Sequence, residues 1–167
     1  MLAMSLDSFI KWLEATPWAA AVRESSNLFP LIESLHVIAI TIVFGTIAIV
    51  DLRLLGVVTL ERRVSRLTAQ MLPCTWIAFA CAAITGTLLF SSNASAYAHN
   101  AFFLRKLVLM SIAGLNMLLF HWAGARGIEQ HDADERLHWQ ARAAGMVSLL
   151  VWTGVVICGR WIGFTMF

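Results

Sequence analysis

The chain has 167 residues, of which 59% are hydrophobic and only 13% are charged, and its mean hydropathy is +0.75. Soluble domains carry about 25% charged residues, and a soluble core of this size cannot hide so much apolar surface, so we predict an integral membrane protein. The small net charge of +2, without a basic stripe or a glycine-rich phosphate loop, argues against nucleic acid as a partner.

The N-terminal segment, residues 1–28, predicts two short helices that lie at the membrane surface. Apolar residues recur at helical spacing from Leu6 to Leu13, which is typical of an interfacial helix. Charged residues among them break the apolar run that a cleaved signal peptide needs. Thr16 and Pro17 then predict an N-cap and a first-turn proline for the second short helix.

The rest of the chain, residues 29–167, predicts one bundle of four transmembrane helices. Crossing about 30 Å of hydrocarbon takes about 20 apolar residues. Four segments meet this requirement, at 31–55, 67–90, 102–122 and 143–164. No stretch between them resembles a linker between domains. The predicted fold class is therefore all-α, an integral membrane four-helix bundle with a short interfacial segment before it.

Arginines in the connections between these spans predict the orientation in the membrane, because cytoplasmic loops are enriched in Lys and Arg. The second connection, SSNASAYAHNAF, has no charge. The first and third connections hold six arginines: Arg62, Arg63, Arg66, Arg126, Arg136 and Arg142. We expect both termini on the periplasmic side of a bacterial inner membrane. Arg105 and Lys106 lie on the wrong side for this rule, which hints at a role other than topology.

Ionisable residues inside the spans form two levels. Such residues cost at least about 2.5–3.5 kcal/mol at mid-helix and are therefore candidates for function. His36 and Asp51 are 15 residues apart on the first span, as are Lys106 and His121 on the third, which runs in the same direction. We expect His36 and Lys106 at the outer level, together with Arg160 of the fourth span. Asp51 and His121 belong about 22 Å deeper, so His36 and His121 cannot ligate one iron.

Each of these residues also has an interpretation without a cofactor. His36 could hydrogen-bond to a neighbouring helix, and Lys106 could extend its amine to the interface. His121 could interact with free carbonyl groups at a helix end. Asp51 and Arg53 could be interfacial charges. The sequence has no hydrolase motif and no continuous polar stripe that would predict a channel.

Four segments carry a resemblance to known proteins: LHVIAITIVFGTIAIVDLRLLG, LPCTWIAFACAAITGTLLF, NAFFLRKLVLMSIAGLNMLLFH and GRWIGF. They resemble an uncharacterised family of small bacterial four-helix membrane proteins, over nearly all the chain after residue 28. More distantly, the pattern is similar to the HemJ-type protoporphyrinogen oxidases and the CopD-type membrane domains. The HemJ-type family binds haem b and has a Leu-His pair in helix one and a lysine opening helix three. Here these residues are Leu35-His36 and Lys106.

The sequence departs from the HemJ-type pattern after the histidine. The tryptophan and paired glycines that often follow the histidine in the HemJ-type family are replaced here by Phe44 and Gly45. Haem binding is therefore expected to carry over more readily than porphyrinogen oxidation.

These observations lead us to expect a b-type cytochrome-like membrane protein, an oxidoreductase that passes electrons from a quinol or porphyrin-like donor to an acceptor on the outer side. His36 would be an axial ligand of haem iron. Lys106 would be the opposite ligand or, with Arg105 and Arg160, a cation for a haem propionate. A second haem on His121 is an alternative.

Other classes of function remain open at this point. The chain could be a cofactor-free transporter, an assembly subunit of a membrane complex, or a strict protoporphyrinogen oxidase. The expected partners are the lipid bilayer, a quinone or redox protein, and further copies of the chain in a homo-oligomer.

Overall fold

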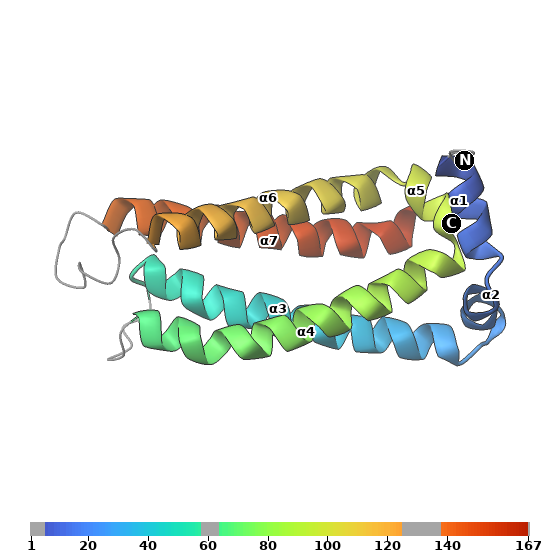
Figure 1. The fold of residues 1–167 in the computed structure, drawn as a ribbon, viewed down its shortest axis with the longest axis horizontal. Helices are drawn as coiled ribbons and strands as arrows, with labels where there is room; N and C mark the ends of the chain where they lie inside the picture. The colour runs from blue at the N-terminus through green and yellow to red at the C-terminus, as the bar shows by residue number, and fades with distance from the viewer. Residues whose placement is uncertain (1–5, 58–63, 125–137, 167) are drawn as a thin grey trace.

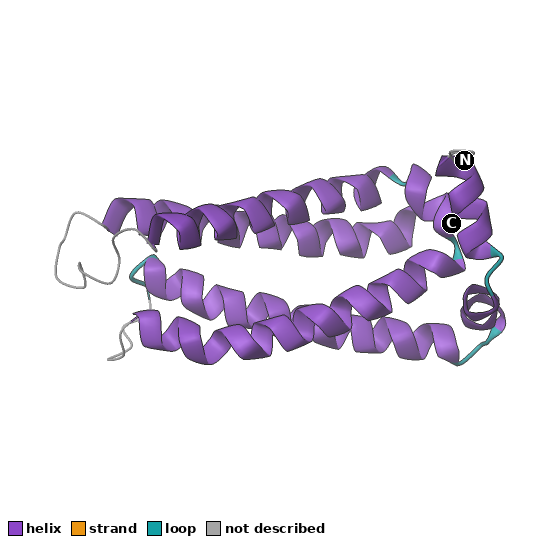
Figure 2. Cartoon of the chain, in the orientation of Figure 1, coloured by secondary structure: helices purple, strands orange, loops and turns teal. Residues whose placement is uncertain are grey.

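The computed structural model describes residues 6–57, 64–124 and 138–166, and every regular element in these ranges is a helix (Figures 1 and 2). In chain order the helices are α1 (Leu6–Glu14), α2 (Pro17–Glu24), α3 (Leu28–Leu54), α4 (Val64–Ser92), α5 (Ala94–His99), α6 (Ala101–Gly124) and α7 (His138–Thr165). The predicted all-α class is confirmed.

Four helices are long and apolar enough to cross a membrane, so the chain is a multi-pass membrane protein. Their candidate spans are Leu28–Leu54, Ala69–Ser92, Ala101–Leu119 and Ala141–Thr165. The predicted spans agree with these to within a few residues at each end. Many large apolar side chains on them point outward, such as Ile38 at 57% exposure, as expected for a surface in contact with lipid.

The spans pack as two pairs, α3 with α4 and α6 with α7, and the pairs meet where α3 packs against α7 (Figure 1). Small residues permit close approach at this seam. A Cβ added to Gly145 of α7 would lie 3.2 Å from the backbone oxygen of Asp51 on α3. Helix α4 continues through Pro73 without a break.

Helices α1, α2 and α5 lie together at one end of the bundle, here termed the capped end (Figure 1). The two N-terminal helices were predicted, with Thr16 at the N-cap of α2 and Pro17 in its first turn. The Thr16 side chain does not cap α2, however. Its hydroxyl donates instead to the Leu13 carbonyl of α1, at 2.6 Å.

Helix α5 was not predicted, because its segment was interpreted as a loop. The Glu14 carboxylate of α1 accepts hydrogen bonds from the Ser95 amide (2.7 Å) and hydroxyl (3.0 Å). These bonds satisfy a free N–H in the first turn of α5. On the same helix, burial raises the pKa of the Tyr97 phenol, and the charge of Glu33 raises it further.

The opposite end of the bundle, where α3 finishes, contains a Schellman motif. Gly56 has a φ of +75°, which favours glycine, and the amides of Gly56 and Val57 both bond back to carbonyls of α3 at 3.1 Å. Arg142 of α7 donates two hydrogen bonds, each of 3.2 Å, to the Leu55 carbonyl. The DLRLLG segment therefore encodes a helix end that is fastened to α7.

Candidate functional site

His36 is half-buried on α3, and its imidazole faces α4. The ring Nδ1 lies 2.9 Å from the Thr85 hydroxyl oxygen. Thr85 donates its single proton to a carbonyl of its own helix, at 2.7 Å from the Cys81 oxygen. With the hydroxyl proton on that carbonyl, the hydroxyl oxygen accepts from Nδ1–H, and this assignment of the tautomer leaves a lone pair on Nε2 of a neutral imidazole.

Gly86, the next residue of α4, makes room for this ring. A Cβ added at Gly86 would lie only 2.9 Å from His36 Cε1 and 3.5 Å from Nδ1. Contacts this short do not occur, so a larger residue would displace the imidazole. Thr85 and Gly86 together determine where the His36 ring lies.

Lys106 of α6 approaches the same region from the other helix pair. Its half-buried side chain lies along α7, where a Cβ added at Gly159 would be 3.9 Å from the amine nitrogen. Lys106 is the sixth residue of α6 and His36 is the ninth residue of α3, so both lie near the capped end. The structure thus places His36 and Lys106 at the same end of the bundle, on helices of different pairs.

The two arginines predicted for the outer level lie apart from this pair. Arg105 is exposed and lies 5.1 Å from the centre of the Phe102 ring, and Arg160 is exposed and lies 5.0 Å from the centre of the Phe164 ring. Each forms a cation–π contact within its own helix. His121 belongs to the last turns of α6, but its side chain lies outside the described part of the chain, so its predicted role stays a prediction.

Asp51 is buried near the opposite end of the bundle, with only 5% of its surface exposed. Its carboxyl group interacts with Ser148 of α7, and Oδ2 has no hydrogen-bond partner among the described residues. Asp51 lines a cavity of about 230 Å³ that is formed by all four spans. The cavity lining does not include His36 or Lys106.

Asn116 of α6 also lines this cavity and was missed in the sequence. Its amide nitrogen donates to the Ala144 carbonyl of α7, at 3.2 Å. An amide in the middle of an apolar span usually bonds to a neighbouring helix, so extending the search from ionisable residues to amides would have found Asn116.

Comparison with protein-family models matches residues 9–165 to a family of unknown function (DUF6644). No curated protein and no solved structure matches the chain. The family match begins within α1, well before residue 28, where the resemblance described above begins. The matched region therefore includes most of α1 and all of α2.

Proposed function

Because the chain belongs to this family of unknown function, its activity has to be inferred from its own side chains, and we propose that it binds haem b and transfers electrons. His36 would hold the iron through Nε2. The observation that carries the proposal is the 2.9 Å hydrogen bond between Nδ1 and Thr85. Metal-ligating histidines almost always donate their other ring N–H in this way. A bound haem b would supply one-electron redox chemistry at a potential tuned by ligand identity and burial.

Lys106 supports the same proposal from the facing helix pair. A half-buried amine at the same end of the bundle as the imidazole would serve either as the opposite ligand or as a cation for a haem propionate. Arg105 and Arg160 are exposed near the capped end and suit the propionates or an acidic acceptor surface. A second haem on His121 remains the alternative.

The proposed orientation places the capped end on the periplasmic side of a bacterial inner membrane. The arginine-rich connections of the sequence join helices at the opposite end, which favours a cytoplasmic position for that end. Electrons would then pass from a quinol or porphyrin-like donor in the membrane to an acceptor outside. Strict porphyrinogen oxidation is a narrower alternative, and the departure at Phe44 and Gly45 weighs against it.

The absorption spectrum of the detergent-purified protein tests this proposal. We expect a Soret band in the wild type and its loss in His36→Ala. The matched control is His99→Ala, since His99 is an exposed histidine whose ring bonds only locally, to the Ser95 carbonyl at 2.8 Å. A wild-type protein without a Soret band, or a band that survives in His36→Ala, would refute the haem assignment.

A further inference from the structure

The cavity beside Asp51 is large enough for a small organic molecule. Its volume is about 230 Å³, and α3, α4, α6 and α7 all contribute to its walls. An apolar cavity of about 150 Å³ in another protein holds benzene. The cavity in this chain would therefore accommodate an aromatic ring with a short side chain.

Asp51 gives this cavity a polar group that needs a partner. The residue is 95% buried, and Oδ2 of its carboxyl group makes no hydrogen bond within the described residues. Burying a carboxyl oxygen without a partner is costly. A ligand that donates a hydrogen bond to Oδ2 would remove this cost.

The threonine hydroxyl groups on the cavity wall already have acceptors within the protein. Thr46 donates to the Ile42 carbonyl (2.9 Å), and Thr75 donates to the Met71 carbonyl (2.9 Å) or to Thr46 (2.8 Å). Asn116 donates one of its two amide hydrogens to a backbone carbonyl, and its side-chain oxygen is a further acceptor. The buried group on the wall that lacks a partner is thus an acceptor, Asp51 Oδ2, and a matching ligand has to supply a donor.

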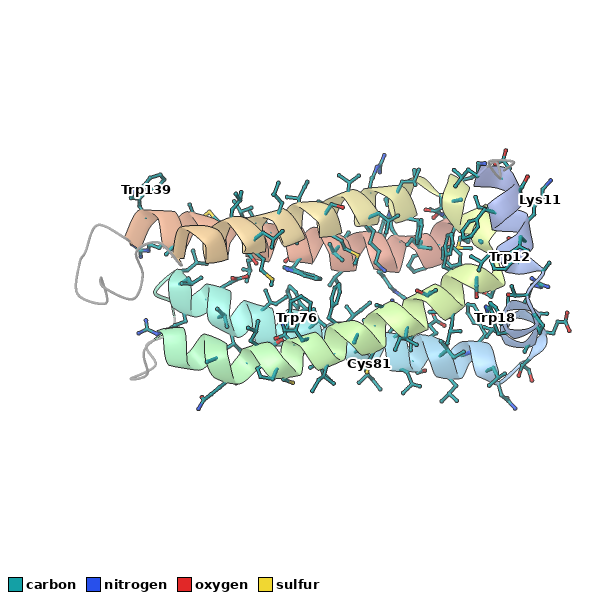
Figure 3. All side chains as sticks on the ribbon, viewed as in Figure 1. Lys11, Trp12, Trp18, Trp76, Cys81 and Trp139 are labelled. Carbon is teal, nitrogen blue, oxygen red and sulfur yellow. The ribbon has the colours of Figure 1, made fainter. Side chains whose placement is uncertain are left out.

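Aromatic and sulfur-containing side chains form much of the remaining wall. Trp76 and Phe79 lie edge to face, with their ring centres 6.0 Å apart, and Trp152 lines the cavity from α7. Figure 3 shows Trp76 about midway along the bundle. Aromatic faces attract cations, most strongly when water is excluded. Methionines from α4 and α6 add a deformable apolar surface.

We propose that this cavity binds a small organic cation, with a protonated amine on the Asp51 carboxylate and an apolar or aromatic body against Trp76, Phe79 and Trp152. The ammonium supplies the missing donor and neutralises the buried charge in one contact. The site is separate from His36 and Lys106, so the proposal does not depend on haem.

Calorimetric titration of the purified full-length protein tests the proposal with three probes of similar size. They are 2-phenylethylamine, the neutral 2-phenylethanol and the anionic 3-phenylpropionate. We expect one amine per chain, bound at least tenfold more tightly than the alcohol, and no binding of the anion. Absence of amine binding, or equal or tighter binding of the alcohol, would overturn the proposal.

Two matched pairs of variants place the amine in the cavity. Gly114 lines the cavity and has open space around its Cβ position, so Gly114→Leu puts an apolar side chain at the site and should abolish amine binding. Gly163 is equally open but lies outside the lining, and Gly163→Leu should bind as the wild type does. Amine binding that persists in Gly114→Leu would reflect partition into the micelle and would also overturn the proposal.

The second pair tests the charge. Asp51→Asn should weaken amine binding at least tenfold and leave alcohol binding unchanged. Glu33→Gln removes an exposed carboxylate from the same helix and should have no effect. An Asp51→Asn protein that binds the amine with wild-type affinity would contradict the assignment of the carboxylate, and Gly114→Leu provides the test if Asp51→Asn does not fold.

Discussion

Two residues of α4 hold the His36 imidazole in place. The Thr85 hydroxyl is hydrogen-bonded to the ring, and Gly86 has no side chain in the space that the ring occupies. Nothing larger than hydrogen fits at position 86, since a Cβ there would lie 2.9 Å from His36 Cε1. The position of the proposed iron ligand therefore depends on Gly86, a residue without a side chain that could bind a metal or a substrate.

The variant Gly86→Ala tests this contact. The added methyl group overpacks the contact with His36 at a cost of about 1–3 kcal/mol, so we expect a lower melting temperature in detergent, monitored by circular dichroism. Gly45→Ala is the matched control, because a Cβ at Gly45 meets no atom within 4 Å. Alanine is better than glycine in a helix, so Gly45→Ala should be neutral or stabilising. Equal melting temperatures in the two variants would contradict the described packing.

Which of these residues a sequence can reveal depends on their chemistry. His36 and Lys106 stand out because an ionisable group in an apolar span is costly wherever its helix faces. Thr85, Gly86 and Ser148 are ordinary residues of a membrane helix, and their roles arise only from the rotation of α4 and α7 against α3. Hydropathy gives the depth of a residue but does not identify its neighbour.

At the scale of helices, Asn100 joins the start of α6 to the end of α7. Its side-chain oxygen accepts hydrogen bonds from the amides of Phe102 (2.9 Å) and Phe103 (3.1 Å), which makes it a true N-cap. Its amide nitrogen donates to the Thr165 hydroxyl, at 2.8 Å. One side chain thus satisfies two free N–H groups and fixes the register of the α6–α7 pair.

Replacing this cap should destabilise the bundle. Loss of an N-cap costs about 1 kcal/mol, and loss of the second hydrogen bond adds about 1 kcal/mol. We therefore expect Asn100→Ala to lower the free energy of unfolding, measured by titration with a denaturing detergent, by about 2 kcal/mol. Asn93→Ala is the control, since Asn93 is at the N-cap of α5 and its side chain makes no cap bond. A similar loss in both variants would argue against the cap.

Helix boundaries were predictable where the signal is local. Pro17 marks the start of α2, and Gly56 marks the end of α3 through its own backbone conformation. Helix α5 was missed because the group that satisfies its first turn, the Glu14 carboxylate, is 81 residues away in the chain. Short helices supported by such distant contacts have no signature in the segment itself.

At the scale of the whole molecule, four spans form two pairs that carry two different polar regions. The His36 and Lys106 region lies towards the capped end, and the Asp51 cavity lies towards the other. The spans and their order followed from hydropathy, and the separation of His36 from Asp51 followed from their spacing along one helix. The cavity could not be predicted in this way. Its volume depends on how four helices pack against one another, and hydropathy does not encode this geometry.

The capped end closes the bundle with helices that do not span the membrane. Arg23 of α2 donates to the Ser92 carbonyl at the end of α4, at 3.2 Å, and Glu14 of α1 binds the first turn of α5. Phe90 and Phe103 stack with their ring centres 5.3 Å apart, which joins α4 to α6 across this end. The family match begins at residue 9, so the residues that form these contacts lie within the matched region.

The central claim, that haem b is ligated by His36, is tested most directly by chemical rescue of His36→Gly. The measurement is the haem that co-migrates with the protein during size-exclusion chromatography, with and without added imidazole. We predict that the variant carries no haem alone and regains it with imidazole, because the free base occupies the space left beside Thr85 and Gly86. Haem that stays with the variant when imidazole is absent, or that does not return when imidazole is present, would contradict the account.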